Sequence, residues 1–293
     1  MNKILFIFLD GVGIGEKKPS NPFYQKELFL TDILDALNKE DFFLKDGISA
    51  KKIDVVGKVD EIPQSATNQS TIFTGVDCVK YYGGHKSGFP DKKLKEILKK
   101  ESIFKKLKNL NIPSFFANAF TPEYFAGKRK RLSVTTLSAI YGGINFRSIF
   151  EIPDKKTLFH DFTNISLNIY GYNFPIFDTI TASKVLINIS KDFNFTLYEF
   201  FLTDIAGHHQ DMELATTILE ILDAFLFNVF KLAKRNDITL LITSDHGNIE
   251  DLSLKHHTKN FVPLILTGKG KEMIENIDAL WDITPSILKF LKN

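Results

Sequence analysis

The sequence is poor in cysteine, in net charge and in long apolar runs. Its single cysteine, Cys78, cannot form a disulfide within the chain, so nothing points to an oxidising compartment. The formal net charge of +2 over 293 residues gives no reason to expect nucleic acid or a membrane surface as a partner. The apolar run from Ile4 to Leu9 is too short for a membrane span or a signal sequence, and Asp10 follows it where a cleavage site would have small residues. We therefore expect a cytoplasmic protein.

The sequence also lacks a dinucleotide fingerprint. In the segment 10–15, DGVGIG, the third glycine comes one residue too early for that motif. The residues at 17–22, KKPSNP, are typical of a loop and not of the helix that the motif would open. Asp10 is better interpreted as a carboxylate at the rim of a sheet, because the continuous apolar run before it is typical of a strand buried on both faces.

Histidine, in contrast, is concentrated in one region, since five of the seven histidines lie between His208 and His257. Asp204 and Asp245 follow apolar, strand-like runs, and carboxylates beside neutral imidazoles form a ligand set that Zn²⁺ or Mn²⁺ accepts. Asp204 and His208 are four residues apart, so one helical turn could direct both at a single ion. Asp245 and His246 are adjacent, and diverging neighbours suit two ions a few ångströms apart. The alternative is that these are ordinary polar loop residues.

A second informative stretch surrounds Ser65. Pro63 followed by small hydroxyl residues and then by Ile72 and Phe73 predicts a helix start. A phosphate held there would be stabilised by free backbone N–H groups, and a metal could turn the serine hydroxyl into a nucleophile. The alternative is a simple N-cap serine.

Taken together, the order and spacing of five motifs resemble the alkaline phosphatase superfamily of two-metal enzymes. This superfamily includes phosphopentomutase, cofactor-independent phosphoglycerate mutase and the nucleotide pyrophosphatase/phosphodiesterases. The motifs are Asp10-Gly11 after a strand, Ser65 ten residues before Gly75, Asp204-x-x-Gly207-His208, Asp245-His246-Gly247, and His257-Thr258 before Val262-Pro263.

The resemblance implies a role for each matching residue. Ser65 would be the nucleophile and a ligand of the ion that activates it. That ion would be held by Asp10, Asp245 and His246, and a second divalent ion, Zn²⁺ or Mn²⁺, by Asp204, His208 and His257.

Two neighbouring positions bear on the substrate. Asn68 matches an asparagine that touches a phosphate oxygen in the phosphodiesterases, whereas Gln69 replaces the histidine usual in the families compared. This departure leaves the substrate class open. His85, His160, His209 and His256 receive no role.

The middle of the chain carries none of these motifs. We expect residues 1–80 and 195–293 to form the metal-binding catalytic core, and residues 81–194 to be an insertion, partly cap and partly core. Helical patterns cover 92–110, 132–150 and 178–192, and a strand is expected near Phe115. The basic residues Lys128, Arg129 and Arg131 belong either to a solvated loop or to a surface that attracts a phosphorylated substrate.

The alternation of strands and helices predicts an α/β fold with a mostly parallel sheet covered by helices on both faces, an alkaline phosphatase-like core with a small inserted cap. The resemblance implies hydrolysis of a phosphate mono- or diester through Ser65, with a small phosphorylated molecule as substrate. The alternatives are a phosphomutase and a non-catalytic protein that binds a phosphorylated metabolite. Sulfatase chemistry is less expected, because Ser65 does not lie in a Cys/Ser-x-Pro-x-Arg sequence.

Overall fold

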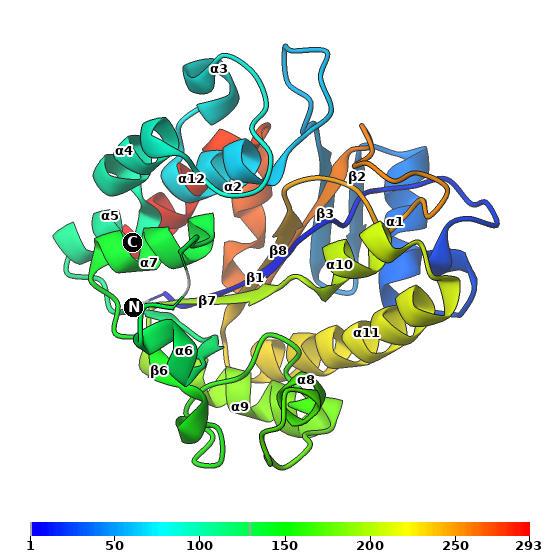
Figure 1. The fold of residues 1–293 in the computed structure, drawn as a ribbon. Coiled ribbons are helices and arrows are strands. Elements are labelled where there is room, and N and C mark those ends of the chain that lie inside the picture. The colour runs from blue at the N-terminus through cyan, green and yellow to red at the C-terminus, as the bar shows by residue number, and fades with distance from the viewer. Residues whose placement is uncertain (1, 129) are drawn as a thin grey trace.

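The computed structural model describes residues 2–128 and 130–293, and a seven-stranded sheet crosses the molecule in the order β2-β3-β9-β8-β1-β7-β4 (Figure 1). Its strands are β1 (Ile4–Leu9), β2 (Phe42–Lys45), β3 (Ile48–Ile53), β4 (Ser114–Phe116), β7 (Phe195–Phe200), β8 (Thr239–Ser244) and β9 (Val262–Thr267). The pairs β1–β7, β1–β8 and β4–β7 are parallel, and β8–β9, β3–β9 and β2–β3 are antiparallel. β3 therefore runs in the same direction as β8, and five of the seven strands point one way. The predicted α/β fold with a mostly parallel sheet is confirmed.

Helices cover both faces of this sheet (Figure 1). They are α1 (Phe29–Lys39), α2 (Ser65–Thr74), α3 (Cys78–Tyr82), α4 (Lys92–Glu101), α5 (Ile103–Asn109), α6 (Pro122–Phe125), α7 (Val134–Gly142), α8 (Ile165–Ile169), α9 (Thr179–Asp192), α10 (Leu202–His209), α11 (Met212–Arg235) and α12 (Leu280–Lys292). Three 3-10 helices, η1 (Pro22–Tyr24), η2 (Ile149–Glu151) and η3 (Gly268–Asn276), and a small sheet of β5 (Ala119–Phe120) and β6 (Arg147–Ser148) complete the described elements.

The strand β1 separates two hydrophobic cores. Successive side chains of a strand point to opposite faces, and every residue of β1 is buried. One core packs α1, α9 and α11 against Leu5, Ile7 and Leu9; the other packs α2, α5, α7 and α12 against Ile4, Phe6 and Phe8. The continuous apolar run Ile4–Leu9 is therefore a strand buried on both faces, as predicted.

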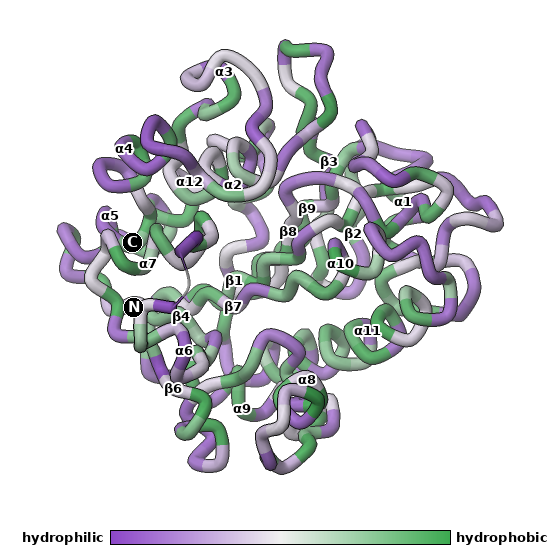
Figure 2. The backbone as a smooth tube through the Cα atoms, viewed as in Figure 1, coloured by the Kyte–Doolittle hydropathy of each residue, from purple (hydrophilic) through white to green (hydrophobic). Residues whose placement is uncertain are grey.

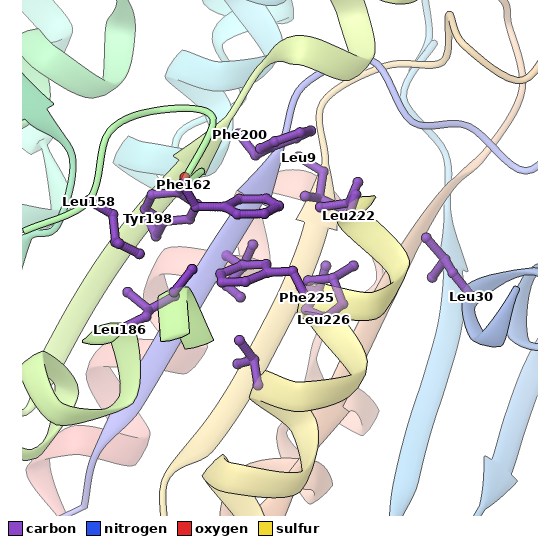
Figure 3. Close-up of a cluster of buried hydrophobic side chains, with 14 of the residues drawn as sticks. Leu9, Leu30, Leu158, Phe162, Leu186, Tyr198, Phe200, Leu222, Phe225 and Leu226 are labelled. Carbon is purple, nitrogen blue, oxygen red and sulfur yellow. The ribbon is translucent and has the colours of Figure 1, made fainter. Parts of the chain in front are cut away.

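The longest helix, α11, shows how its sequence directs one face inward. Asp211 caps its first turn by accepting a hydrogen bond from the backbone N–H of Leu214. Its apolar stripe includes Phe225, whose ring stacks on Phe162 with centroids 4.1 Å apart (Figure 3). This contact fixes the loop before α8 against α11, and Phe162 also stacks on Phe200 at the end of β7.

Much of the middle segment packs on the sheet. β4, near the predicted strand at Phe115, pairs with β7, α7 packs against α5 and α2, and α9 packs against α11. The lysine-rich pattern at 92–110 forms two helices, α4 and α5, which are separated at Ser102. In Figure 2 the outer helix α4 is mostly hydrophilic. The division into a core and a capping insertion stays a prediction.

One expected element is misplaced. The alternating apolar residues at 51–60 predict a strand or hairpin there, but β3 ends at Ile53 and residues 54–60 form bends and turns. The hairpin instead joins β2 to β3 through Asp46 and Gly47, whose φ angles of 54° and 87° suit a tight two-residue turn. Among the described residues, no helix is both long enough and apolar enough to cross a membrane.

Candidate metal centre

The candidate ligands gather where β1, β7 and β8 end. Leu9 of β1 lies opposite Ser244 of β8, so Asp10 and Asp245 leave the sheet side by side. β7 runs directly into α10, and this helix carries Asp204 in its first turn. The parallel strands therefore bring three carboxylates from distant parts of the sequence to one edge of the sheet.

The first group consists of Asp10, Asp245 and His246, whose ligand atoms all lie within 4.8 Å of one another. His246 Nε2 lies 3.3 Å from Asp10 Oδ1 and 3.4 Å from Asp245 Oδ2. The prediction that adjacent Asp245 and His246 serve different ions is wrong for this grouping. The chain bends after β8, where Ser244 Oγ donates to the carbonyl of His246, and both side chains join one group.

The second group consists of Asp204, His208 and His257, within the same 4.8 Å limit. His208 Nε2 lies 3.4 Å from Asp204 Oδ2 across one turn of α10, and His257 Nε2 lies 3.6 Å from Asp204 Oδ1. The expected helical turn after β7 is confirmed. The rings of His246 and His257 stack with centroids 3.6 Å apart, so the two groups adjoin.

The backbone fixes which nitrogen of His257 is free. Its Nδ1 lies 2.9 Å from the carbonyl of Pro63, which can only accept, so Nδ1 carries the hydrogen. Nε2 then presents a lone pair beside Asp204 and 3.3 Å from His208 Nε2. A cation bound by His208 Nε2, His257 Nε2 and the Asp204 carboxylate accounts for these short distances better than a hydrogen bond between the two imidazoles.

The first group places two buried carboxylates, Asp10 and Asp245, beside one imidazole, His246. Burial, reinforced by the neighbouring Asp10, raises the pKa of Asp245, and burial is also the main cause of the raised pKa of Asp10. Burial alone would lower the pKa of His246, but the charges of Asp245 and Asp10 raise it to about 10. Without a metal, His246 therefore holds a proton at neutral pH, while burial opposes negative charge on both carboxylates.

The second group behaves differently because it is partly exposed. Burial would raise the pKa of Asp204, but hydrogen bonding from His208 and the charge of His246 lower it to about 2. The hydrogen bond to Asp204 raises the pKa of His208, whereas burial lowers the pKa of His257 to about 4. The side chain of His208 is 44% exposed, so solvent reaches this group.

Ser65 lies at the junction of these groups. It is the first residue of α2, and its Oγ is 2.9 Å from His246 Nε2. The N-cap of α2 is Gln64, so the alternative of a simple N-cap serine does not hold. The nearby N–H of Ala66 donates to the carbonyl of Lys86 and is not free for a phosphate.

These groups fit divalent metal ions. Asp10 Oδ1 and Asp245 Oδ1 are buried without a hydrogen-bond partner in the described structure. Buried acceptor atoms left in this way favour a bound cation. Carboxylate and imidazole ligands in both groups suit Zn²⁺ and Mn²⁺.

The comparisons agree with this geometry. A family model described as the metalloenzyme superfamily matches residues 172–293. The 2,3-bisphosphoglycerate-independent phosphoglycerate mutase of Anaplasma marginale is 31% identical over 126 residues, 40% of this chain and 26% of that protein. The enzyme of the same name from Mycoplasmoides gallisepticum is 30% identical over 113 residues, 36% of this chain and 22% of that protein. The matched stretches thus span about a quarter of these relatives' length.

Solved structures share the fold over nearly the whole chain. Alkaline phosphatase from the Antarctic bacterium TAB5 superposes with a TM-score of 0.54 at 13% identity, over 99% of this chain and 98% of that one. Phosphoglycerate mutase of Leishmania mexicana gives a TM-score of 0.53 at 10% identity, over 99% and 95%. These comparisons show an alkaline phosphatase-like fold over the chain and a match to the metalloenzyme superfamily over residues 172–293. The superfamily model begins after Asp10 and Ser65, so these two positions rest on the motif and the geometry.

One contact that the resemblance implies does not fit the structure. Asn68 is 1% exposed, and its Nδ2 donates to the carbonyls of Val55 and Asp245. Both amide hydrogens are used, so neither is free for a phosphate oxygen. Asn68 instead ties α2 to the loop that carries Asp245.

The basic residues are not placed at the site by any described contact. Lys128 and Arg131 are exposed after α6, and Arg129 lies outside the described residues. Their contact with substrate stays a prediction. Of the other histidines, His209 and His256 are exposed, His85 lies 3.3 Å from Thr67 Oγ1, and the ring of His160 lies against Phe201.

Sequence reasoning missed Glu250, which joins the loop after β1 to both ends of the connection between β8 and β9. Its carboxylate is fully buried and accepts hydrogen bonds from the N–H groups of Gly13 and Asn248 and from the side chains of Thr258 and Asn260. A Cβ at Gly13 would lie 2.2 Å from Glu250 Oε1, which explains this glycine by close approach. Asn248 in turn donates to Asp204 Oδ1 at 2.7 Å and orients that carboxylate.

Proposed function

We propose that the protein is a metal-dependent phosphoryl-transfer enzyme that hydrolyses a phosphate mono- or diester through Ser65. The carrying observation is the position of Ser65 Oγ, 2.9 Å from His246 Nε2 and at the junction of two metal-ligand groups. In the superfamily reaction that this geometry supports, the oxygen of Ser65 bonds to phosphorus and the ester oxygen leaves, taking up a proton. Water then breaks the phosphoserine bond and restores the hydroxyl.

Asp10, Asp245 and His246 would hold one divalent ion, and Asp204, His208 and His257 the other. Bound divalent ions would lower the pKa of a hydroxyl or water and offset negative charge on the reacting oxygens. The remaining roles belong to the chain: α2 fixes Ser65, Pro63 orients His257, and Asn248 orients Asp204.

Access of water favours hydrolysis over transfer within one substrate. Ser65 is only partly buried, and His208 faces solvent, so water could reach a phosphorylated serine. A phosphomutase is the second candidate, because the curated relatives named above are phosphoglycerate mutases. A small phosphorylated substrate and a cytoplasmic location are parts of the proposal.

Turnover of matched aryl phosphate esters tests this proposal. We expect the protein loaded with Mn²⁺ or Zn²⁺ to release the aryl alcohol from a monoester or a diester, and Ser65→Ala to abolish release. Ser70→Ala is the matched control, because Ser70 lies on the same helix and its Oγ donates only to the carbonyl of Ala66. No release from either ester by a protein that binds both metals would overturn hydrolysis and favour the mutase or the non-catalytic binding protein.

A further inference from the structure

The amide of Gln69 lies between the two carboxylates of the first group. Its Nε2 is 3.2 Å from Asp10 Oδ2 and 3.0 Å from Asp245 Oδ2. The side chain is buried, with 4% of the residue exposed, so water does not compete for these hydrogen bonds. An amide nitrogen has two hydrogens, and each carboxylate can take one.

These hydrogen bonds fix how the two carboxylates face His246. The Oδ2 atoms of Asp10 and Asp245 accept from Gln69, while both Oδ1 atoms are buried without a hydrogen-bond partner in the described structure. His246 Nε2 lies 3.3 Å from Asp10 Oδ1 and 3.4 Å from Asp245 Oδ2. The amide thus holds each carboxylate in one orientation beside this nitrogen, and a carboxylate oxygen that accepts one hydrogen bond keeps a lone pair for a cation.

The position of Gln69 also connects the ligands to the nucleophile. Ser65 and Gln69 are four residues apart on α2, so they lie on one face of the helix. The same rigid helix therefore presents the hydroxyl to His246 and the amide to the two carboxylates. Because the amide is neutral, it satisfies both carboxylates without adding a charge that would oppose a cation.

We propose that Gln69 is a positioning residue that sets the affinity of the Asp10–Asp245–His246 group for a divalent ion. This inference rests on the metal sites of the proposed function, but it requires no catalysis. Partners that orient metal ligands typically account for about 10- to 100-fold in metal affinity. Loss of the amide should therefore weaken the first group and leave the Asp204–His208–His257 group unchanged.

Metal titration of the full chain tests this assignment. Gln69→Met removes both N–H donors while keeping the length and helix propensity of the side chain. Binding of Mn²⁺ to metal-stripped protein is measured by isothermal titration and by the electron paramagnetic resonance signal of the free ion. We expect one of two Mn²⁺ sites to weaken about 10- to 100-fold in Gln69→Met, and neither to change in Ser70→Ala.

Two further variants assign the affected site. In a Gln69→Met, His208→Ala double variant only the weakened site should remain, whereas Asp245→Asn alone should remove that site. Circular dichroism of each metal-free protein checks folding, and Gln69→Ala replaces Gln69→Met if the latter does not fold. If Gln69→Met binds Mn²⁺ at both sites with wild-type affinity, or weakens both sites equally, the positioning role of Gln69 is overturned and the proposed function is not. A wild-type protein that binds no divalent ion overturns the proposed function as well.

Discussion

At the scale of single residues, Glu199 is a buried acid that the proposed chemistry does not use. It lies one residue before the end of β7, and Thr135 Oγ1 donates to its Oε2 at 2.8 Å. Burial is the main cause that raises the pKa of Glu199 from 4.5 to about 8. The carboxyl is therefore protonated in the folded protein at neutral pH, whereas it is ionised in the unfolded chain.

Glu199→Gln should stabilise the metal-free protein at pH 7. The folded pKa is raised, so the contribution of Glu199 to stability is complete below pH 4.5 and is lost as the pH rises toward about 8. The amide keeps an acceptor for Thr135 and removes this loss, which corresponds to roughly 3 kcal/mol at pH 7. Urea unfolding at several pH values measures it, with the exposed Glu96→Gln as control. A stability difference between Glu199→Gln and wild type that does not change between pH 5 and 8 contradicts this account.

Residue types and spacing were enough to bring Asp10, Asp204 and Asp245 to one edge of the sheet and His208 to one helical turn from Asp204, whereas the division into two ligand groups followed from the resemblance. They were not enough for Asn68, since its hydrogen bonds depend on how α2 meets the loop after β8. Glu250 was missed for a similar reason. Its partners come from the loop after β1 and from two places in the connection between β8 and β9, which only the folded chain brings together.

At the scale of elements, α2 is fixed at its C-terminal end by a glycine. Gly75 has φ of 73°, and a Cβ there would lie 2.8 Å from Pro285 Cδ of α12. Thr284 Oγ1 also donates to the carbonyl of Ile72, so α12 holds the helix that carries Ser65.

Gly75→Ala should destabilise the protein more than Gly83→Ala. Both glycines end helices with positive φ, 73° and 93°, but a Cβ at Gly83 would meet nothing within 4 Å. Backbone strain alone costs about 1–2 kcal/mol in this region. The additional loss of stability in Gly75→Ala then measures the clash of the new Cβ with Pro285. Thermal unfolding of both variants measures it, and equal losses would show that α12 moves aside without cost.

The helix α9 was predictable from apolar periodicity and lies close to the expected range 178–192. The separation of α4 from α5 was not, because Ser102 carries no helix-breaking signal. Ser102 is fully buried and its Oγ donates to the carbonyl of Ser138 in α7, so tertiary packing sets this break. The hairpin turn can be predicted from the local sequence Asp46-Gly47, whereas the alternation at 51–60 does not mark a further strand.

At the scale of the whole molecule, the two candidate ligand groups join segments far apart in the chain. The ligands of the two groups come from the ends of β1 and β8, from α10 and from the loop before β9. An ion that binds only the folded arrangement stabilises it, by about 2.7 kcal/mol at a concentration 100 times the Kd.

The effect of Asp245→Asn on the stability of the protein should therefore change sign when metal is added. In metal-free protein at neutral pH the variant should be more stable than wild type, because burial raises the pKa of Asp245 and ionisation in the unfolded chain disfavours folding as the pH rises. In saturating Mn²⁺ the wild type should be the more stable, because the variant has lost a ligand. Melting temperatures with EDTA and with Mn²⁺ measure this reversal, and the same rank order in both conditions would contradict a metal at Asp245.

The substrate could not be predicted from the sequence, because the middle segment carries no motif and its basic residues make no described contact with the site. The fold is shared by phosphatases and mutases alike. The choice between these reactions depends on how long a phosphorylated Ser65 is protected from water.

Detection of that phosphoserine tests the central claim most directly. Metal-loaded protein is mixed with an aryl phosphate monoester or diester that it turns over, quenched in acid, digested and analysed by mass spectrometry. The account predicts a phosphoryl group on the peptide containing Ser65, absent from Ser65→Ala and retained in Ser70→Ala. Turnover with no phosphorylation of Ser65, or equal turnover in Ser65→Ala, would contradict it.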